Sequence, residues 1–151
     1  MAHSKTILYP CDFSANTKKV AAYTAEIADK LGADVIALYV VEDLGRWART
    51  VIPHPSIDQY QKEAEKAARE KMDAFVKKHL APRVPATPAV MRGDPAEQIL
   101  QAAREKKVDL MIMGTHGRSG LEHVLFGSVA ETVVTRSPVP VLVVTPDRMP
   151  G

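Results

Sequence analysis

The chain has little of three residue types that small proteins use for special structural purposes: cysteine, glycine and the aromatics. Its 151 residues include one cysteine, 8 glycines and 5% aromatic residues. A single cysteine, Cys11, cannot form a disulfide within the chain, which excludes a domain built on disulfides. We therefore expect one domain over residues 1–151 that depends on an ordinary core, because a chain of this length can bury about 70% of its extended surface.

Long hydrophobic runs and a strong excess of one charge are also missing. The apolar runs are the length of β-strands, well short of the ~20 residues that span a bilayer, and no apolar signal region follows Met1. We therefore expect a cytoplasmic protein with no membrane partner. The 20 basic and 18 acidic residues give a net charge of +2, which does not favour a protein dedicated to binding nucleic acid.

Short apolar segments alternate with longer amphipathic ones along the chain. The segments that we expect to be strands are Lys5–Pro10, Asp34–Val41, Ala86–Met91, Asp109–Met113 and Val139–Thr145. Their hydrophobicity is continuous rather than alternating, which is typical of parallel strands covered on both faces. Pro140 lacks a backbone N–H, so the last strand fits the edge of a sheet better than its centre.

Four helices are expected between these strands. The first runs from Ser14 to a C-terminal cap at Gly32, and the second carries apolar residues at helical spacing over Ile57–Leu80. The third starts after an N-cap at Asp94, and the fourth covers about Ser128–Arg136. The resulting β-α-β-α-β-α-β-α-β order predicts an α/β protein with a doubly wound, five-stranded parallel sheet.

Half of the glycines fall in one short segment between the fourth strand and the last helix. They are Gly114, Gly117, Gly120 and Gly127. In an open α/β sheet, ligands bind beyond the carboxyl ends of the strands, where the strand order reverses. Glycines there let backbone N–H groups approach an anion closely. Ser128 adds a hydroxyl and the amides of a helix N-terminus, and Arg118 adds a positive charge.

The spacing of this segment differs from the two common phosphate-binding fingerprints. The chain has no Gly-Lys pair, which a Walker A loop requires, and no G-x-G-x-x-G. It has G-x2-G-x9-G-S instead. The residues alone leave an alternative open, in which the glycines serve turns, Ser128 is an ordinary N-cap and Asp12 only caps the first helix. His116 and His123 lack cysteine or carboxylate partners at a known ligand spacing, so we expect no zinc site.

The sequence resembles the universal stress protein family over nearly its whole length. The segments that carry the resemblance are KTILYPCDFS (5–14), VVED (40–43), RGDPAEQI (92–99), DLMIMGTHGRSG (109–120) and SPVPVLVV (137–144). Because the glycine motif is complete, the chain resembles the ATP-binding branch of that family. The resemblance implies the strand order three-two-one-four-five, ATP as ligand, and a homodimer formed through Val139–Thr145.

The resemblance also implies roles for individual residues. Asp12 resembles the acidic residue at the ribose end of the nucleotide, where it could also hold Mg²⁺ beside phosphate oxygens. Pro10 and Cys11 resemble backbone contributors beside the adenine, and Val40 resembles an adenine wall and backbone partner. The positions that lead into or form the phosphate side are Met113, Gly114, Gly117, Arg118, Gly127, Ser128 and Val129.

Three functions remain open at this point. The leading one is an ATP-binding protein of stress response or signalling. The second is slow ATP hydrolysis, but the chain offers no P-loop lysine, no assignable general base and no Ser-His-Asp set, so no residue is assigned as catalytic. The third is a homodimeric interaction module that binds no nucleotide.

Overall fold

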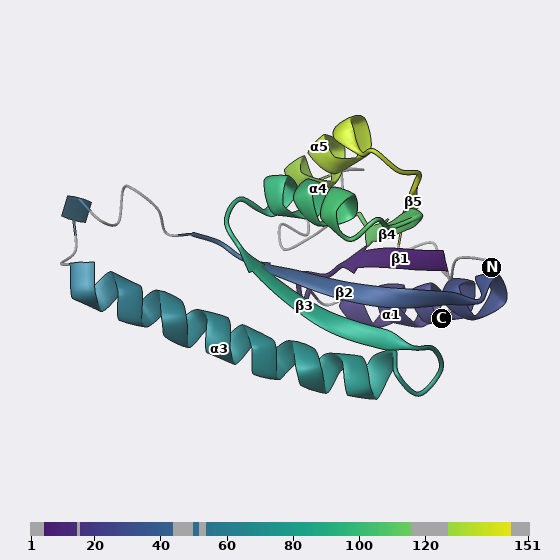
Figure 1. Ribbon diagram of the computed structural model, residues 1–151, viewed down its shortest axis with the longest axis horizontal. Coiled ribbons are helices and arrows are strands. Elements are labelled where there is room, and N and C mark those ends of the chain that lie inside the picture. Colours follow the sequence, from purple (N-terminus) through teal and green to yellow (C-terminus); the bar gives the residue numbers. More distant parts are fainter. Residues whose placement is uncertain (1–4, 15, 44–49, 52–53, 116–126, 146–151) are drawn as a thin grey trace.

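The computed structural model contains the nine expected elements in the expected order (Figure 1). It describes residues 5–14, 16–43, 50–51, 54–115 and 127–145. The strands are β1 (Lys5–Pro10), β2 (Ala33–Val41), β3 (Ala86–Arg92), β4 (Leu110–Gly114) and β5 (Val141–Val144). The helices that separate them are α1 (Thr17–Leu31), α3 (His54–His79), α4 (Pro95–Glu105) and α5 (Ser128–Arg136).

The strands form one parallel sheet in the order β3-β2-β1-β4-β5. This confirms the doubly wound fold and the edge position of the last strand, whose Pro140 carbonyl accepts a hydrogen bond from the Met111 amide at 2.9 Å. The chain runs outward from β1 to β3 and then crosses back to β4, so the strand order reverses between β1 and β4. These two strands pair only through Ile7 with Leu110 and Leu8 with Met111.

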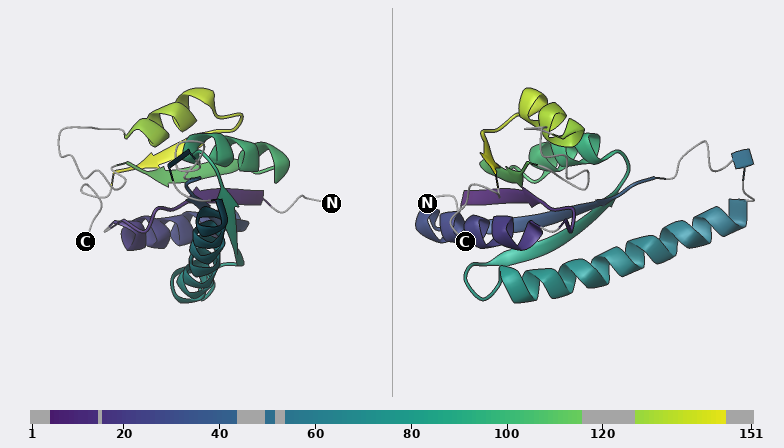
Figure 2. Two further views of the ribbon diagram at one scale, coloured as in Figure 1. Left: turned by 90° about the vertical axis from the view of Figure 1, so that its left-hand side faces the viewer. Right: turned by 180° about the vertical axis from the view of Figure 1, so that it is seen from behind.

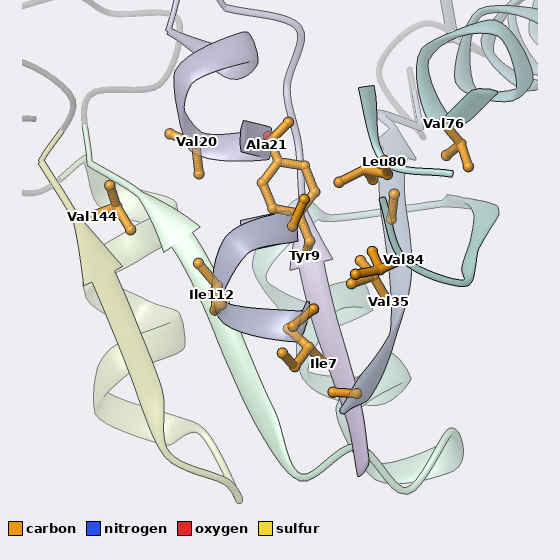
Figure 3. Packing of buried hydrophobic residues seen from close by; sticks show 14 of the residues in the cluster. Ile7, Tyr9, Val20, Ala21, Val35, Val76, Leu80, Val84, Ile112 and Val144 are labelled. Carbon is orange, nitrogen blue, oxygen red and sulfur yellow. The ribbon is translucent and has the colours of Figure 1, made fainter. Parts of the chain in front are cut away.

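Both faces of the sheet are buried, which explains the continuous hydrophobicity of the strands. Successive side chains point to opposite faces, so Ile7 and Tyr9 pack against α1 and α3, whereas Leu8 and Met111 pack against α4 and α5. Figure 3 shows the first of these two cores, where the ring of Tyr9 lies among side chains from the helices and neighbouring strands. Tyr9 is 1% exposed, and its hydroxyl donates to the Thr17 carbonyl at 3.1 Å.

The helix α3, with 26 residues, is longer than the part of the sheet that it covers. It runs along β2 and β3, and its first turns extend beyond the carboxyl ends of the strands, as two opposite views agree (Figure 1, Figure 2). Its buried side chains include Ala68, Met72 and Val76. None of the helices that the structure describes is long and apolar enough to cross a membrane.

Two helix ends confirm the sequence prediction. Asp94 is the N-cap of α4 and accepts a hydrogen bond from the Glu97 amide at 3.0 Å. Gly32 follows α1 in the left-handed conformation, with φ 65°.

Lys107, the residue after the C-cap of α4, has a left-handed backbone as well, with φ 50°, although it is not a glycine. A left-handed backbone costs an L residue roughly 1–2 kcal/mol.

The two left-handed positions, Gly32 and Lys107, yield a prediction about the stability of the protein. We expect Lys107→Gly to raise the free energy of unfolding by about 0.5 kcal/mol or more, because relief of the left-handed strain outweighs the added freedom of the unfolded chain. We expect Gly32→Ala to lower it by about 1 kcal/mol, or roughly 2–4 °C in Tm. No atom lies within 4 Å of a Cβ at Gly32, so only the backbone effect acts there. Urea unfolding of both variants checks this, and a shift of the same sign in both would contradict it.

Candidate functional site

A cavity of about 380 Å³ opens at the carboxyl edge of the sheet, where the strand order reverses. Its wall is built from the ends of β1, β2 and β4 and from the first residues of α1, α4 and α5. The pairing of β1 with β4 stops at Leu8 and Met111, and the cavity occupies the space between the two strands beyond these residues. This is the place where open α/β sheets bind ligands.

All nine predicted site residues that the structure describes lie in the wall of this one cavity. They are Pro10, Cys11, Asp12, Val40, Met113, Gly114, Gly127, Ser128 and Val129. The other two, Gly117 and Arg118, lie outside the described residues, as do His116 and His123. Residues more than 100 positions apart in the sequence are therefore brought to one site.

The backbone of Val40 faces the cavity. The Leu38 carbonyl points toward β1 and accepts a hydrogen bond from the Cys11 amide at 2.8 Å, while the Val41 carbonyl points toward β3 and accepts one from Gly93 at 3.0 Å. Along a strand, alternate residues direct both backbone groups to the same side, so Val40 points as Leu38 does. The register of β1 with β2 ends at Pro10, opposite Leu38. Val40 therefore presents an N–H and a carbonyl side by side to the space beyond β1.

Asp12 is fixed by the turn between β1 and α1. Its Oδ1 accepts hydrogen bonds from the Ser14 amide at 2.9 Å and the Thr17 hydroxyl at 3.3 Å. The alternative that Asp12 caps α1 is wrong, because Asn16 is the N-cap and makes no side-chain capping bond. The carboxylate holds the turn that precedes the helix instead, which keeps it in the cavity wall.

The next residue, Phe13, has a left-handed backbone, with φ 59°. This conformation is rare for an aromatic residue and persists only where the surroundings hold it. The ring of Phe13 lies 4.9 Å from that of Tyr39 and 5.8 Å from that of Phe75, and the Lys71 ammonium lies 4.3 Å above it. Nothing in the sequence pattern predicted this turn.

The two described glycines of the motif are constrained differently. A Cβ at Gly114 would lie 3.1 Å from Cγ2 of Val20, so a side chain there would force Val20 to shift by a few tenths of an ångström in the packing of α1 on β4. Gly127 has φ −71°, and no atom of the described residues lies within 4 Å of a Cβ there, so neither its backbone nor its packing on the described chain requires glycine. Gly127 is also the N-cap of α5, which corrects the alternative that Ser128 is the cap; Ser128 is the first helical residue.

The electrostatics of the cavity depend on backbone groups more than on charged side chains. In the part of the chain that the structure describes, its wall contains the carboxylates of Asp12 and Glu42 and no lysine, arginine or histidine. The N-termini of α1 and α5 both contribute to the wall, and neither N-cap makes a side-chain capping bond. Helix N-termini attract anions, although the first amide of α1, that of Thr17, already donates to the Ser14 carbonyl at 3.1 Å.

Sequence reasoning missed several residues of the wall. They include Tyr9, Tyr39, Glu42, Pro95, Ile99 and Thr115. Glu42 could have been found from strand periodicity, because it lies two residues after Val40. The Thr115 hydroxyl is buried and has no hydrogen-bond partner among the described residues, so it is a polar atom at the cavity that the described protein leaves unsatisfied.

No metal site is preformed in the described residues, where no group of three or more histidine, cysteine, aspartate or glutamate side chains is placed to hold an ion.

A wider hollow of about 630 Å³ lies at the opposite, amino edge of the sheet, next to residues 81–87. It contains none of the predicted site residues, so the cavity at the carboxyl edge is the candidate site.

Cys11 is a partly buried side chain between the cavity wall and the core. Burial, together with the neighbouring Asp12 carboxylate, raises the pKa of its thiol to about 12, against the opposing effects of Lys71 and of a hydrogen bond from the Phe13 backbone. The sulfur of Cys11 lies 3.4 Å from the Met72 sulfur in the core. These contacts favour a structural thiol over a reactive one.

We therefore expect the Cys11 thiol to resist alkylation in the folded protein. At about pH 8 the thiolate population should be on the order of a thousandfold lower than in the unfolded chain, because only the thiolate reacts and its formation is suppressed by burial. Iodoacetamide labelling followed by mass spectrometry, with and without denaturant, measures the ratio. Equal labelling rates in the two states would contradict a buried thiol.

Comparison with known proteins agrees with this architecture. The sequence matches the universal stress protein family over residues 3–145. Universal stress protein MJ0531 of Methanocaldococcus jannaschii is 35% identical over 143 residues, which cover 93% of this chain and 81% of the relative. The solved structure of MJ0577, from the same organism, is 28% identical with a TM-score of 0.78 and covers 99% of this chain and 100% of its own.

A more distant solved structure, a universal stress protein in complex with cAMP, is 21% identical with a TM-score of 0.60. It covers 96% of this chain and 99% of its own, and at that identity the likeness shows the fold alone. The family match spans every strand and helix described above. The chain belongs to the universal stress protein family.

Proposed function

We propose that this protein binds ATP in the carboxyl-edge cavity and acts in stress response or signalling. The observation that carries the proposal is the convergence of nine predicted nucleotide-contact residues on the wall of one cavity. Its volume of about 380 Å³ falls within the range of small-molecule sites. The family includes a structure with cAMP, which supports an adenine nucleotide as the class of ligand.

The adenine is assigned to the end of the cavity at β2. The Watson–Crick edge of adenine carries an amino donor beside a ring-nitrogen acceptor, and Val40 presents a carbonyl beside an N–H. Pro10 and Cys11 border the same end from β1, and the side chain of Ile99 adds an apolar wall from α4. Ribose then lies toward Asp12.

The phosphates are assigned to the N-terminus of α5. Gly127, Ser128 and Val129 offer backbone N–H groups there, and Gly114 and Met113 border them from β4. A ligand that approaches the backbone closely is a reason for glycine at position 127, where the described part of the fold supplies none. Gly117 and Arg118 belong to the same proposed phosphate site.

Mg²⁺ fits this site only together with the nucleotide. The cation usually takes one or two carboxylates and completes its shell with phosphate oxygens and water. Asp12 supplies a carboxylate in the wall, and the described wall has no cationic side chain that would neutralise a triphosphate. We therefore assign Asp12 as the protein ligand of Mg²⁺ bound with ATP, where the ion offsets the phosphate charge.

The nucleotide proposal is tested with Gly127→Ala. Among the described residues a methyl group has space at this position and the backbone is ordinary, so the main cost to the folded protein is the poorer N-cap, at most about 1 kcal/mol of stability. The methyl group would, however, lie where the proposal places the phosphates. We expect the Kd for ATP with Mg²⁺, measured by calorimetric titration, to rise about tenfold.

Gly32→Ala is the matched control, because it lowers stability at the amino edge and should leave the Kd unchanged. Replacing Mg²⁺ with EDTA should weaken the wild-type complex, and Asp12→Asn should remove most of that difference. No heat with wild-type protein at up to about 1 mM ATP would refute the proposal, as would an unchanged Kd for Gly127→Ala.

We also propose a cytoplasmic homodimer that pairs through Val139–Thr145. The strand β5 is an edge of the sheet, and its Val141, Leu142 and Val143 are only half-buried. Pro140 and Val144 direct carbonyls to β4, so the intervening Val141 and Val143 direct their backbone groups outward. An apolar edge with unpaired backbone groups is suited to pairing with a second copy.

Val143→Pro tests the dimer because it removes an outward N–H, and proline is tolerated on the outer side of an edge strand. We expect light scattering at micromolar concentration to give a dimer for the wild type and for the control Val143→Thr, and a monomer for Val143→Pro. A monomeric wild type would refute the pairing. ATP affinity, measured in parallel, shows whether the variant keeps its fold.

A further inference from the structure

The helix α3 holds the rim of the cavity without forming any of its wall. No described residue of α3 lines the cavity. Nevertheless, α3 contacts the carboxyl ends of three strands or the residues that follow them. These contacts are Gln61 Nε2 to the Glu42 carbonyl at 3.1 Å, Glu65 to Arg92 at 3.2 Å and the Met72 sulfur to Cys11 at 3.4 Å.

Phe13 links this helix to the cavity most directly. Its ring packs on Phe75 of α3 at 5.8 Å between centroids, with the Lys71 ammonium 4.3 Å from the ring centre. On its other side the ring packs on Tyr39, which lines the cavity, at 4.9 Å. The residue before it, Asp12, also lines the cavity.

The left-handed backbone of Phe13 makes these contacts necessary for the shape of the turn. A free phenylalanine avoids φ 59°, so the turn keeps this conformation only while the ring is held between β2 and α3. The same turn brings the Ser14 amide and the Thr17 hydroxyl onto Oδ1 of Asp12. If the ring were lost, the backbone would relax and the Asp12 carboxylate would leave its position in the wall.

We propose that Phe13, anchored on α3 by Phe75 and Lys71, is a positioning residue that sets Asp12 and Tyr39 for ligand binding. The inference rests on the proposed nucleotide site and adds a residue outside its wall. It also makes α3 part of the support of the site, because a shift of α3 relative to the sheet would move the Phe13 ring and, through it, Asp12 and Tyr39. Phe13 touches no ligand in this assignment and acts only through its neighbours.

The first test compares the Kd for ATP with Mg²⁺ among four variants, measured by calorimetric titration. Phe13→Leu and Phe75→Leu, which break the ring stack from either side, should raise the Kd about tenfold and about threefold. Phe13→Tyr keeps the ring and should restore wild-type affinity to within about twofold. Leu80→Val, beside the end of α3 and fully buried, should lower Tm and leave the Kd unchanged.

The second test needs no nucleotide and uses Cys11, which lies two residues before Phe13, as a reporter of the turn. In protein free of nucleotide, Phe13→Leu should raise the rate of Cys11 alkylation by at least about tenfold over wild type and Phe13→Tyr. Leu80→Val should not raise it. This readout separates the position of the turn from a general loss of stability.

The outcomes distinguish the two proposals. If wild-type protein binds ATP and Phe13→Leu changes neither the Kd nor the alkylation rate, the role of Phe13 is refuted and the nucleotide site stands. If wild-type protein binds no ATP, the proposed function fails, and the alkylation rates alone decide whether Phe13 sets the turn. An equal effect of Leu80→Val on Kd and alkylation would also refute the positioning role.

Discussion

The short pairing between β1 and β4 is the constraint on which the site depends. Ile7 and Leu8 pair with Leu110 and Met111, and beyond these residues the two strands separate. The crossovers that follow them leave to different sides of the sheet, α1 over one face and α5 over the other, so nothing in the described chain closes the gap. The strand order alone brings the helix starts, the strand ends and the cavity together at this place, whatever the side chains are.

This arrangement explains why a near-neutral chain is suited to an anionic ligand. The described wall carries only Asp12 and Glu42 as charged groups, and both are acidic. In the proposed nucleotide site, attraction for phosphate would come from N–H groups at the starts of α1 and α5, from a cation bound with the nucleotide and from Arg118, which lies outside the described residues. Backbone amides do not appear in a count of charged residues, so the net charge of +2 gives no indication of them.

The features that could be predicted are those marked by a run of apolar residues or by a fixed spacing of glycines in the sequence. Continuous apolar runs located all five strands, and the spacing of Gly114, Gly127 and Ser128 located the edge of the cavity. The left-handed turn at Phe13 could not be predicted, because an aromatic residue has no intrinsic preference for it and the ring contacts come from α3, about sixty positions later. The ion pair between Glu65 of α3 and Arg92 of β3 is a tertiary contact as well, so the local sequence pattern gives no signal for it.

The two described glycines of the motif differ in how a side chain at each position would affect the described fold. A Cβ at Gly114 would lie 3.1 Å from Cγ2 of Val20, so the Val20 side chain would have to shift by a few tenths of an ångström to admit it. Gly127 has no such contact among the described residues. A substitution at 127 therefore probes the proposed ligand site with little disturbance of the described packing, whereas a substitution at 114 also perturbs the packing of α1 on β4.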